Sequence, residues 1–220
     1  MQAVETNLLA VLPHADRAAV VSQLTRRTFR KGETLFHEGD PGDTLHLLGV
    51  GRVAIRISTP EGDIATLTVL GPGTCFGEQA LLNPTSRRTA SAIALEPVET
   101  RVLNRADFER LRRSNPAVEQ FLTGILAAQV RRLSGQLLDA LYAPADRRVA
   151  RRLVELARVY EAGTLPTRVQ VTQQDLGSMA GTTRPTTNRV LKHFEELGLI
   201  AVQRGEVVVI DPVALEWHAG

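Results

Sequence analysis

A short loop of the sequence gathers residue types that could bind a phosphorylated sugar. The stretch FGEQALLNPTSRRTAS, residues 76–91, follows a Gly-Pro-Gly turn and contains Gly77, Glu78, the adjacent arginines Arg87 and Arg88, and Thr89. A guanidinium fork, a hydroxyl and the backbone N–H groups of a glycine-containing loop suit a phosphate. A carboxylate accepts a hydrogen bond from a sugar hydroxyl and discriminates against an analogue without it. The alternative is that Glu78 and Arg88 form an ion pair inside their own domain.

A second set of polar residues lies in VTQQDLGSMAGTTRPTTNRVLKHFEELGLI, residues 171–200. Thr172 and Thr183 each precede a helical pattern as capping residues do, and Gly181 permits a tight turn between the two patterns. This order predicts a helix-turn-helix with helices over 173–179 and 184–196. Its small core is expected to contain Leu176, Met179, Val190, Leu191, Phe194, Leu197 and Leu199.

The second of these helices is suited to DNA, because no acid occurs between Ser178 and Lys192. Its exposed polar residues are expected to be Arg184, Thr186, Thr187, Asn188, Arg189 and Lys192. Arginine can donate two hydrogen bonds to guanine in the major groove, whereas lysine and threonine suit phosphates. The run AVQRGEVVVI, residues 201–210, predicts a hairpin wing around Arg204 and Gly205. The alternative is a solvated helical hairpin whose arginines are incidental.

The elements that must position the first loop are predicted to be short strands. Helical spacing over residues 4–24, broken at Pro13, gives way from Thr28 to about Leu103 to short apolar runs. These runs are Thr34–Phe36, Leu45–Val50, Val53–Ile57, Ile64–Leu70 and Ala92–Leu95. The turn sequences GDPGD, PEGD and GPG separate several of them. Many short strands at close spacing predict a compact β-barrel or roll.

From residue 105 to about Tyr142 the apolar spacing becomes helical. One stripe, with spacings of four, three, four and four, consists of Leu126, Val130, Leu133, Leu137 and Leu141. A second apolar set, Phe121, Leu122 and Ile125, lies on another side of the helix. We expect one face to pack on its own domain and the stripe to pair with a partner, although both faces could be buried inside one domain. Pro144 ends this helix, and Asp146 is expected to cap the next one, over 147–160.

Composition restricts the classes of function. The 220 residues are 43% hydrophobic and 23% charged, which is typical of a soluble protein with a proper core, and they suggest two unequal domains. The net charge is only +2, so a nucleic-acid site must be a local patch. Cys75 is the only cysteine, which excludes an internal disulfide and any iron–sulfur cluster or zinc site built on several thiolates. We predict a cytoplasmic protein without a membrane partner, because neither a signal-peptide pattern nor a long apolar run is present.

The chain resembles the catabolite activator and FNR (Crp/Fnr) family of bacterial transcription regulators. The segment KGETLFHEGDPGDTLHLLGVGRVAI, residues 31–55, resembles that family's barrel entry, residues 76–91 resemble its phosphate-binding cassette, and TRPTTNRVL, residues 183–191, resembles the start of its recognition helix. The resemblance implies an α+β fold in three parts. These are a cyclic-nucleotide-binding β-roll with a jelly-roll-like barrel over 1–116, a long dimerisation helix and hinge over 117–143, and a winged helix-turn-helix over 144–220.

The resemblance also implies roles for individual residues. Gly77 would be the cassette glycine, Glu78 would bind ribose, and Arg88 with Thr89 would bind the cyclic phosphate. The ten-residue separation of Glu78 and Arg88 matches that of cAMP-binding members. The base end departs from the family pattern: Leu133 and Ser134 occupy two positions where adenine-contacting hydroxyls are usual, Gln129 replaces an arginine, and Gln79 replaces an apolar residue.

In the recognition helix, the resemblance assigns base reading to Arg184 and Arg189 and a phosphate contact to Thr186. Thr183, Asn188 and Lys192 of the same acid-free stretch are further candidate DNA-binding residues. Pro185 stands where well-known members have a glutamate that accepts a hydrogen bond from cytosine. We therefore expect a palindromic site with relaxed preference at one base pair per half-site.

The expected function is that of a homodimeric, sequence-specific regulator of promoter DNA under allosteric control by cAMP, with RNA polymerase as a candidate partner. No enzymatic activity, metal, haem or iron–sulfur cluster is expected, since no catalytic constellation stands out and His14, His37, His46, His193 and His218 lack ligand-like spacing. A haem site built on Cys75 with His37 or His46 is disfavoured. Two alternatives are a DNA-binding regulator that needs no ligand and a cyclic-nucleotide-binding module that regulates another protein.

Overall fold

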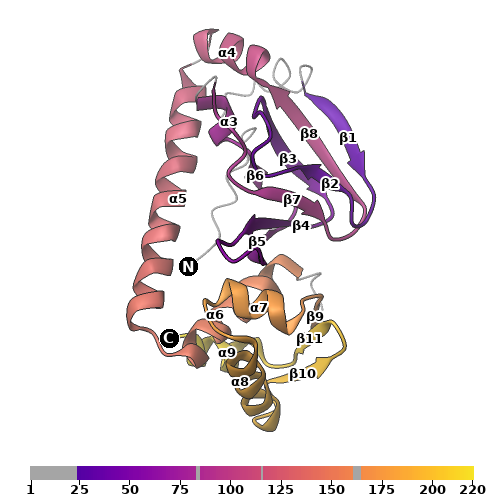
Figure 1. Cartoon of the computed structure of the whole chain (residues 1–220), viewed down its shortest axis with the longest axis vertical. Helices are drawn as coiled ribbons and strands as arrows, with labels where there is room; N and C mark the ends of the chain where they lie inside the picture. The colour runs from indigo at the N-terminus through magenta and orange to yellow at the C-terminus, as the bar shows by residue number, and fades with distance from the viewer. Residues whose placement is uncertain (1–23, 83–84, 115, 161–164) are drawn as a thin grey trace. The chain divides into compact units, whose positions relative to one another are not determined.

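The computed structural model describes residues 24–82, 85–114, 116–160 and 165–220 (Figure 1). The helical spacing predicted over residues 4–24, with its break at Pro13, lies almost entirely outside the described residues. The chain divides into two compact units, whose described residues fall within 24–58 with 70–133 and within 59–69 with 134–220. The predicted domain limits at 116/117 and 143/144 stay predictions.

The β-roll consists of two four-stranded sheets, as predicted, and belongs to the first unit except for residues 64–69 of one strand. One sheet has the order β1 (Thr25–Phe29), β8 (Val98–Asn104), β3 (Thr44–Val50) and β6 (Cys75–Phe76). The other has the order β2 (Thr34–Phe36), β7 (Ser91–Ala94), β4 (Val53–Ser58) and β5 (Ile64–Leu70). The strands β1, β6 and β8 are additional to the predicted ones. Charged residues interrupt the apolar pattern of β1 and β8, which pair antiparallel with Arg26 opposite Arg101.

Two apolar clusters form the core of the roll. The first consists of Leu48, Val53, Phe76, Ala92, Ala94 and Val98, all buried. The second consists of Leu24, Leu45, Leu81, Leu103, Phe108 and Leu111 together with Val118 and Leu122 of the long helix. The roll and the start of the long helix therefore share one core.

Among the described residues, the helices that belong wholly or partly to this unit are α3 (Gln79–Leu82), α4 (Arg105–Ser114) and α5 (Ala117–Tyr142). The helical stretch predicted from residue 105 is therefore two helices, with Pro116 just before the second, where its missing N–H costs nothing. Leu122 is buried and Ile125 packs on the same core, which confirms that one face of α5 packs on its own domain. The side chain of Phe121 lies outside the described set. Leu126 of the predicted stripe is half-buried, whereas Val130, Leu133, Leu137 and Leu141 are exposed.

The second unit contains the predicted helix-turn-helix and wing. Its elements are α6 (Ala145–Tyr160), β9 (Thr167–Val169), α7 (Gln173–Met179), α8 (Arg184–Glu196), β10 (Ile200–Gln203), β11 (Glu206–Val209) and α9 (Pro212–Ala219). Thr172 accepts a hydrogen bond from the backbone N–H of Asp175, Thr183 accepts one from that of Thr186, and Gly181 has a φ of +58°. Both predicted caps and the turn are thereby confirmed.

Three details differ from the sequence expectations. The helix α6 begins at Ala145, so Asp146 lies in its first turn and is not its cap. The helix α9 was not expected, although Asp211 and Pro212 supply the signals of a cap and a first-turn proline. Leu197, expected in the core, is half-exposed because the helix ends there.

Neither a membrane-spanning helix nor a metal-binding cluster is found in the described ranges. None of the helices there is long and apolar enough to cross a bilayer. No group of three or more His, Cys, Asp or Glu side chains in those ranges could hold a metal ion.

A buried histidine lies in the roll. His46 on β3 is 2% exposed, stacks on Phe76 with ring centroids 5.1 Å apart, and has its Nδ1 3.3 Å from Oγ1 of Thr100. Burial, together with the charges of Arg88 and Arg27, lowers the pKa of His46 to about 3. The folded protein therefore keeps this ring neutral under conditions in which an exposed histidine binds a proton.

We predict that His46 makes the fold sensitive to acid. Between pH 6.5, the ordinary pKa, and about pH 3, the unfolded chain binds a proton that the folded chain does not. The free energy of unfolding should then fall by about 1.4 kcal/mol for each pH unit as the pH is lowered through this window. Urea unfolding of the wild type and of His46→Gln at pH 7 and pH 5 measures the difference. The variant should lose less stability than the wild type, with exposed His193→Gln as the control; equal losses in all three proteins would contradict the prediction.

Candidate functional site

The cassette begins with a glycine that no other residue could replace without strain. Gly77 lies between β6 and α3 with a φ of +81°. An added Cβ atom would lie 2.5 Å from Nη1 of Arg88 and 3.0 Å from the carbonyl oxygen of Thr44. Both the backbone conformation and the close approach of Arg88 therefore require glycine here.

Arg88 is the central group of the cassette, and it is only 6% exposed. Its Nη2 donates to Oγ1 of Thr44 at 2.6 Å, and its Nη1 donates to the carbonyl of Gly77 at 3.2 Å. Its Cζ lies 4.0 Å from the centre of the Phe36 ring. The Nε of Arg88 is buried and has no hydrogen-bond partner in the described ranges. Residues of both sheets thus hold the guanidinium, since Thr44 is on β3 and Phe36 on β2.

The direct partners of this buried cation are all neutral. Among the described residues, no ion pair involves Arg88, and the alternative of a Glu78–Arg88 ion pair is not found. Burial lowers the pKa of Arg88, while the more distant carboxylates of Asp43, Asp40 and Glu78 raise it. A buried charge without a hydrogen-bonded counter-ion is costly, so this arrangement suits the arrival of an anion.

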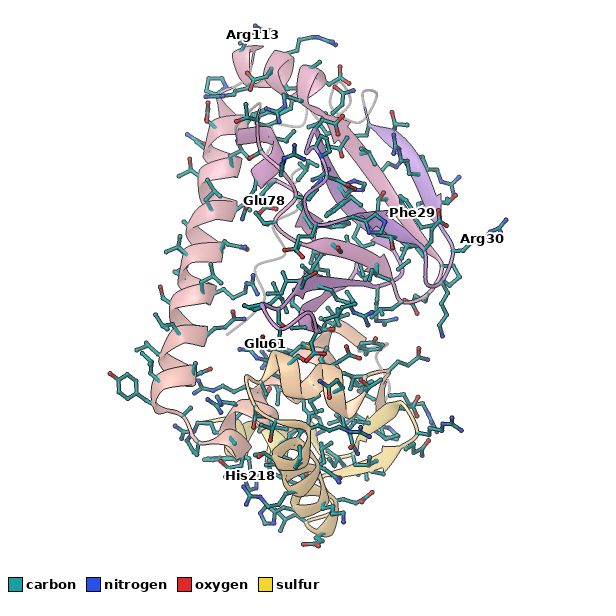
Figure 2. All side chains as sticks on the ribbon, viewed as in Figure 1. Phe29, Arg30, Glu61, Glu78, Arg113 and His218 are labelled. Carbon is teal, nitrogen blue, oxygen red and sulfur yellow. The ribbon has the colours of Figure 1, made fainter. Side chains whose placement is uncertain are left out.

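Glu78 supplies the second ionisable group of the site and lies on the side of the roll that faces α5 (Figure 2). It is 8% exposed. Burial raises the pKa of this carboxyl, whereas its own backbone N–H, Arg132 and Arg88 lower it. A donor that bonded to the carboxylate would favour its ionised form.

Arg132 on α5 is a residue that the sequence analysis missed. It acts electrostatically on Glu78, and its Nη2 donates to Oε1 of Gln129 at 3.4 Å. The signal that could have revealed it is the i, i+3 spacing from Gln129, which puts both residues on one face of the helix. A guanidinium is therefore present on this face although position 129 carries a glutamine.

The remaining residues predicted to bind the nucleotide are more open. Thr89 is exposed beside the buried Arg88, Gln129 is half-buried, and Leu133 and Ser134 are exposed on α5. Gly77, Glu78 and Arg88 are thus the predicted residues that the fold brings together. The assignment of Leu133 and Ser134 to the base stays a prediction.

Arg87 has a structural role. Its exposed side chain donates through Nη1 to the carbonyl of Gly39 at 2.7 Å. The backbone of Arg88, the next residue, forms two hydrogen bonds with the same turn. Its N–H donates to the carbonyl of Asp40, and its carbonyl accepts from the N–H of Gly39, both at 2.8 Å. Arg87 therefore helps to fasten the end of the cassette to the turn that precedes β3.

The helix α8 presents the predicted basic surface. Arg184, Arg189 and Lys192 are exposed, and no ion pair among the described residues involves them. Thr186 and Asn188 are half-buried, and Thr183 is exposed. A shallow depression on this surface is lined by Pro185, Asn188, Arg189, Lys192, His193 and Glu196.

One residue of this helix was assigned wrongly from the sequence. Thr187, expected to be exposed, is fully buried, and its Oγ1 donates to the carbonyl of Thr183 at 3.0 Å. A Cβ atom on Gly177 of α7 would lie 2.9 Å from that hydroxyl, so the two helices pack closely at this point. Thr187 therefore belongs to the contact between α7 and α8.

Comparison with known families gives two matches on this chain. Residues 26–115 match the family model described as "Cyclic nucleotide-binding domain". Residues 147–216 match the one described as "Crp-like helix-turn-helix domain". The first range includes the cassette and the second includes α8.

Two relatives are similar over nearly the whole chain. The "CRP-like cAMP-activated global transcriptional regulator" of Mycobacterium tuberculosis is 32% identical over 205 residues, which are 92% of this chain and 91% of the relative. The "Cyclic AMP receptor protein" of Thermus thermophilus is 35% identical over 196 residues, or 89% and 88% of the two chains.

Two solved structures have the same fold as this chain. The catabolite activator protein of Thermus thermophilus is 34% identical, covers 97% of this chain and 98% of its own, and superposes with a TM-score of 0.57. The c-di-GMP responsive global regulator CLP of Xanthomonas campestris has a TM-score of 0.76, but at 21% identity, over 90% of this chain and 99% of its own, it shows only the shared fold.

The relatives named above are transcription regulators and not enzymes. With its cyclic nucleotide-binding domain and its Crp-like helix-turn-helix domain, this chain belongs to the Crp/Fnr family of transcription regulators.

Proposed function

We propose that this regulator is a homodimer that binds palindromic promoter DNA under the control of cAMP. The observation that carries the proposal is the buried guanidinium of Arg88: among the described residues its hydrogen bonds go only to neutral oxygens and its Nε has no partner. A cyclic phosphate would bring one negative charge to this cation. The glycine loop and the exposed hydroxyl of Thr89 stand beside it as further polar groups.

The carboxylate of Glu78 is suited to bind the ribose of the nucleotide, next to the phosphate that Arg88 would bind. Its buried carboxylate can accept a hydrogen bond from a 2′-hydroxyl, and an unpaired buried carboxylate would penalise a deoxyribose. Two relatives are named for cAMP, which favours this nucleotide. Because the regulator CLP of the same fold is responsive to c-di-GMP, the fold alone does not determine which nucleotide binds. We assign the base end to Gln129, Leu133 and Ser134 of α5.

The exposed stripe of α5 supports a homodimer. Val130, Leu133, Leu137 and Leu141 are 61%, 50%, 59% and 63% exposed in the isolated chain. With Leu126 they repeat at the spacing of a coiled-coil seam, in which a second copy of the same helix would cover them. A two-fold dimer would also present two recognition helices to half-sites about 34–36 Å apart on one face of DNA.

The unpaired cations of α8 support major-groove binding. In this proposal Arg184 and Arg189 read bases, while Lys192, Thr183 and Thr186, with Asn188, contact the phosphates and sugars that flank them. The nucleotide would act by binding one arrangement of the dimer more tightly than another, with residues 143–146 as the hinge. RNA polymerase is a candidate partner on the promoter, and a regulator of bacterial DNA would act in the cytoplasm.

A second candidate is a regulator of the same fold that binds DNA without a ligand. The altered base end favours it, because Gln129 and Leu133 replace the polar residues usual in cAMP-responsive members. A cyclic-nucleotide-binding module that regulates an enzyme or transporter is disfavoured by the helix-turn-helix domain.

We predict that the two adjacent arginines differ sharply in nucleotide binding. Arg88→Ala should weaken cAMP binding about 100-fold or more, because it removes a buried cation from the phosphate. Arg87→Ala should change it by no more than about threefold, because this exposed side chain bonds to the Gly39 carbonyl. Calorimetric titration with cAMP and cGMP gives the affinities. Equal losses in both variants would contradict the assignment, and no wild-type heat alongside tight DNA binding would favour the ligand-independent regulator.

We predict that Leu137→Glu makes the protein monomeric at micromolar concentration. In the proposed seam the two introduced carboxylates, one from each copy of α5, would be buried opposite each other, and their repulsion and burial should prevent dimer formation. Sedimentation equilibrium of the wild type, Leu137→Glu and Arg131→Glu gives the masses, where Arg131 is an exposed residue of α5 outside the stripe. A wild-type monomer, or a Leu137→Glu dimer as stable as the wild type, would rule out the proposed seam.

We predict that Pro185→Glu sharpens DNA preference at one base pair in each half-site. Proline offers only apolar contact, whereas glutamate can accept a hydrogen bond from cytosine, and such a pairing discriminates by about 1–3 kcal/mol. Selection from a random palindromic library with each protein provides the measurement. The wild type should tolerate several bases at the position that Pro185→Glu restricts; identical consensus sequences from both proteins would refute the assignment.

A further inference from the structure

A hydroxyl outside the cassette has the shortest contact with its central arginine. Oγ1 of Thr44, on the first residue of β3, accepts from Nη2 of Arg88 at 2.6 Å. The other contacts of the guanidinium are the carbonyl of Gly77 at 3.2 Å and the face of Phe36 at 4.0 Å. Thr44 was not among the residues expected to take part in ligand binding.

These contacts fix the plane of the guanidinium and leave donors free. An arginine side chain carries five N–H donors. One on Nη2 and one on Nη1 are used by Thr44 and Gly77, and the buried Nε has no partner. The Phe36 ring covers one face of the plane. The orientation of Arg88 is therefore set before any anion arrives, and an anion can use the remaining N–H groups.

Thr44 is itself held by a second interaction. Its Oγ1 lies 3.5 Å from Nε2 of His46, whose Nδ1 lies 3.3 Å from Oγ1 of the buried Thr100. Because the Thr44 oxygen accepts from Arg88, we assign its hydrogen to His46 Nε2 and the ring proton to Nδ1, which then donates to Thr100. The Thr44 hydroxyl is thus directed by a residue packed among the aromatic rings of the roll.

We propose that Thr44 is a positioning residue for the anion site: its hydroxyl holds the Arg88 guanidinium in the orientation that receives the phosphate. This inference rests on the proposed function, because it assumes that Arg88 binds the phosphate of a cyclic nucleotide. A side chain ordered in advance spares the ligand the entropy of ordering it. Phe36 assists by limiting rotation of the plane.

The contact between Thr44 and Arg88 is compatible with two opposite effects on nucleotide binding, and removing the hydroxyl distinguishes them. If the Thr44 contact instead held Arg88 away from the phosphate, its removal would free the arginine and strengthen binding. The two accounts therefore predict opposite signs for the same substitution.

The test compares Thr44→Val, which keeps the branched shape and loses the hydroxyl, with Thr44→Ser, which keeps the hydroxyl. Calorimetric titration of the full chain with 3′,5′-cyclic AMP should show about tenfold weaker binding for Thr44→Val, the size expected for a lost hydrogen bond to a charged group. Thr44→Ser should bind within about twofold of the wild type. Wild-type affinity or tighter binding in Thr44→Val would overturn the proposal.

A double-mutant cycle distinguishes positioning from a general structural effect. In the Arg88→Lys background the planar fork is absent, so Thr44→Val should cost less than about twofold. The same tenfold loss in both backgrounds would show that Thr44 acts independently of Arg88 and would overturn the proposal. Absence of cAMP binding by the wild type would remove the proposed function itself, which is a separate outcome.

A second variant covers the case in which Thr44→Val does not fold. Phe36→Leu keeps an apolar side chain and removes the ring face from the guanidinium. It should weaken cAMP binding severalfold in the wild-type background and leave it unchanged with Arg88→Lys. Losses of equal size in the two backgrounds would overturn the proposed orientation of Arg88.

Discussion

The buried guanidinium of Arg88 is the constraint around which the N-terminal unit is organised. A cation with 6% exposure is costly unless nearby groups satisfy it, and here its direct partners are a hydroxyl, a carbonyl and an aromatic face. Those partners come from β3, from the loop after β6 and from β2. The two sheets of the roll must therefore be assembled before the arginine is held. Gly77 is required in the same arrangement, because a side chain there would collide with the guanidinium.

The same constraint explains why the site is suited to an anion more than to a neutral ligand. Burial lowers the pKa of Arg88, the carboxylates of Asp43, Asp40 and Glu78 oppose this only in part, and no ion pair among the described residues neutralises the guanidinium directly. A ligand that carries both a phosphate and a hydroxyl could satisfy Arg88 and Glu78 together. The cations of α8 differ from Arg88 because they are exposed. They can therefore contact the phosphates and base edges of a DNA groove directly.

Much of this architecture could be predicted from short-range signals. The caps Thr172 and Thr183, the turn at Gly181 and the wing were predictable because each depends on neighbouring residues. The β-roll followed from its turn sequences, but β1 and β8 did not, because charged residues interrupt their apolar pattern. Thr44 and Phe36 could not be connected to Arg88, because these contacts join residues far apart in the sequence. The burial of Thr187 was missed because it depends on the close approach of Gly177, a feature of tertiary packing.

If the Arg88 guanidinium receives the phosphate of a cyclic nucleotide, its Nε, which has no partner among the described residues, gains an anionic acceptor. The arginine Nε–H region of the ¹H–¹⁵N NMR spectrum during titration with cAMP measures this change, with the Arg88 signal identified by its loss in Arg88→Lys. We expect this signal to move with ligand occupancy toward the shift of a hydrogen bond to an anion, while the signal of Arg87 stays in place. Binding of cAMP without movement of the Arg88 signal would contradict it.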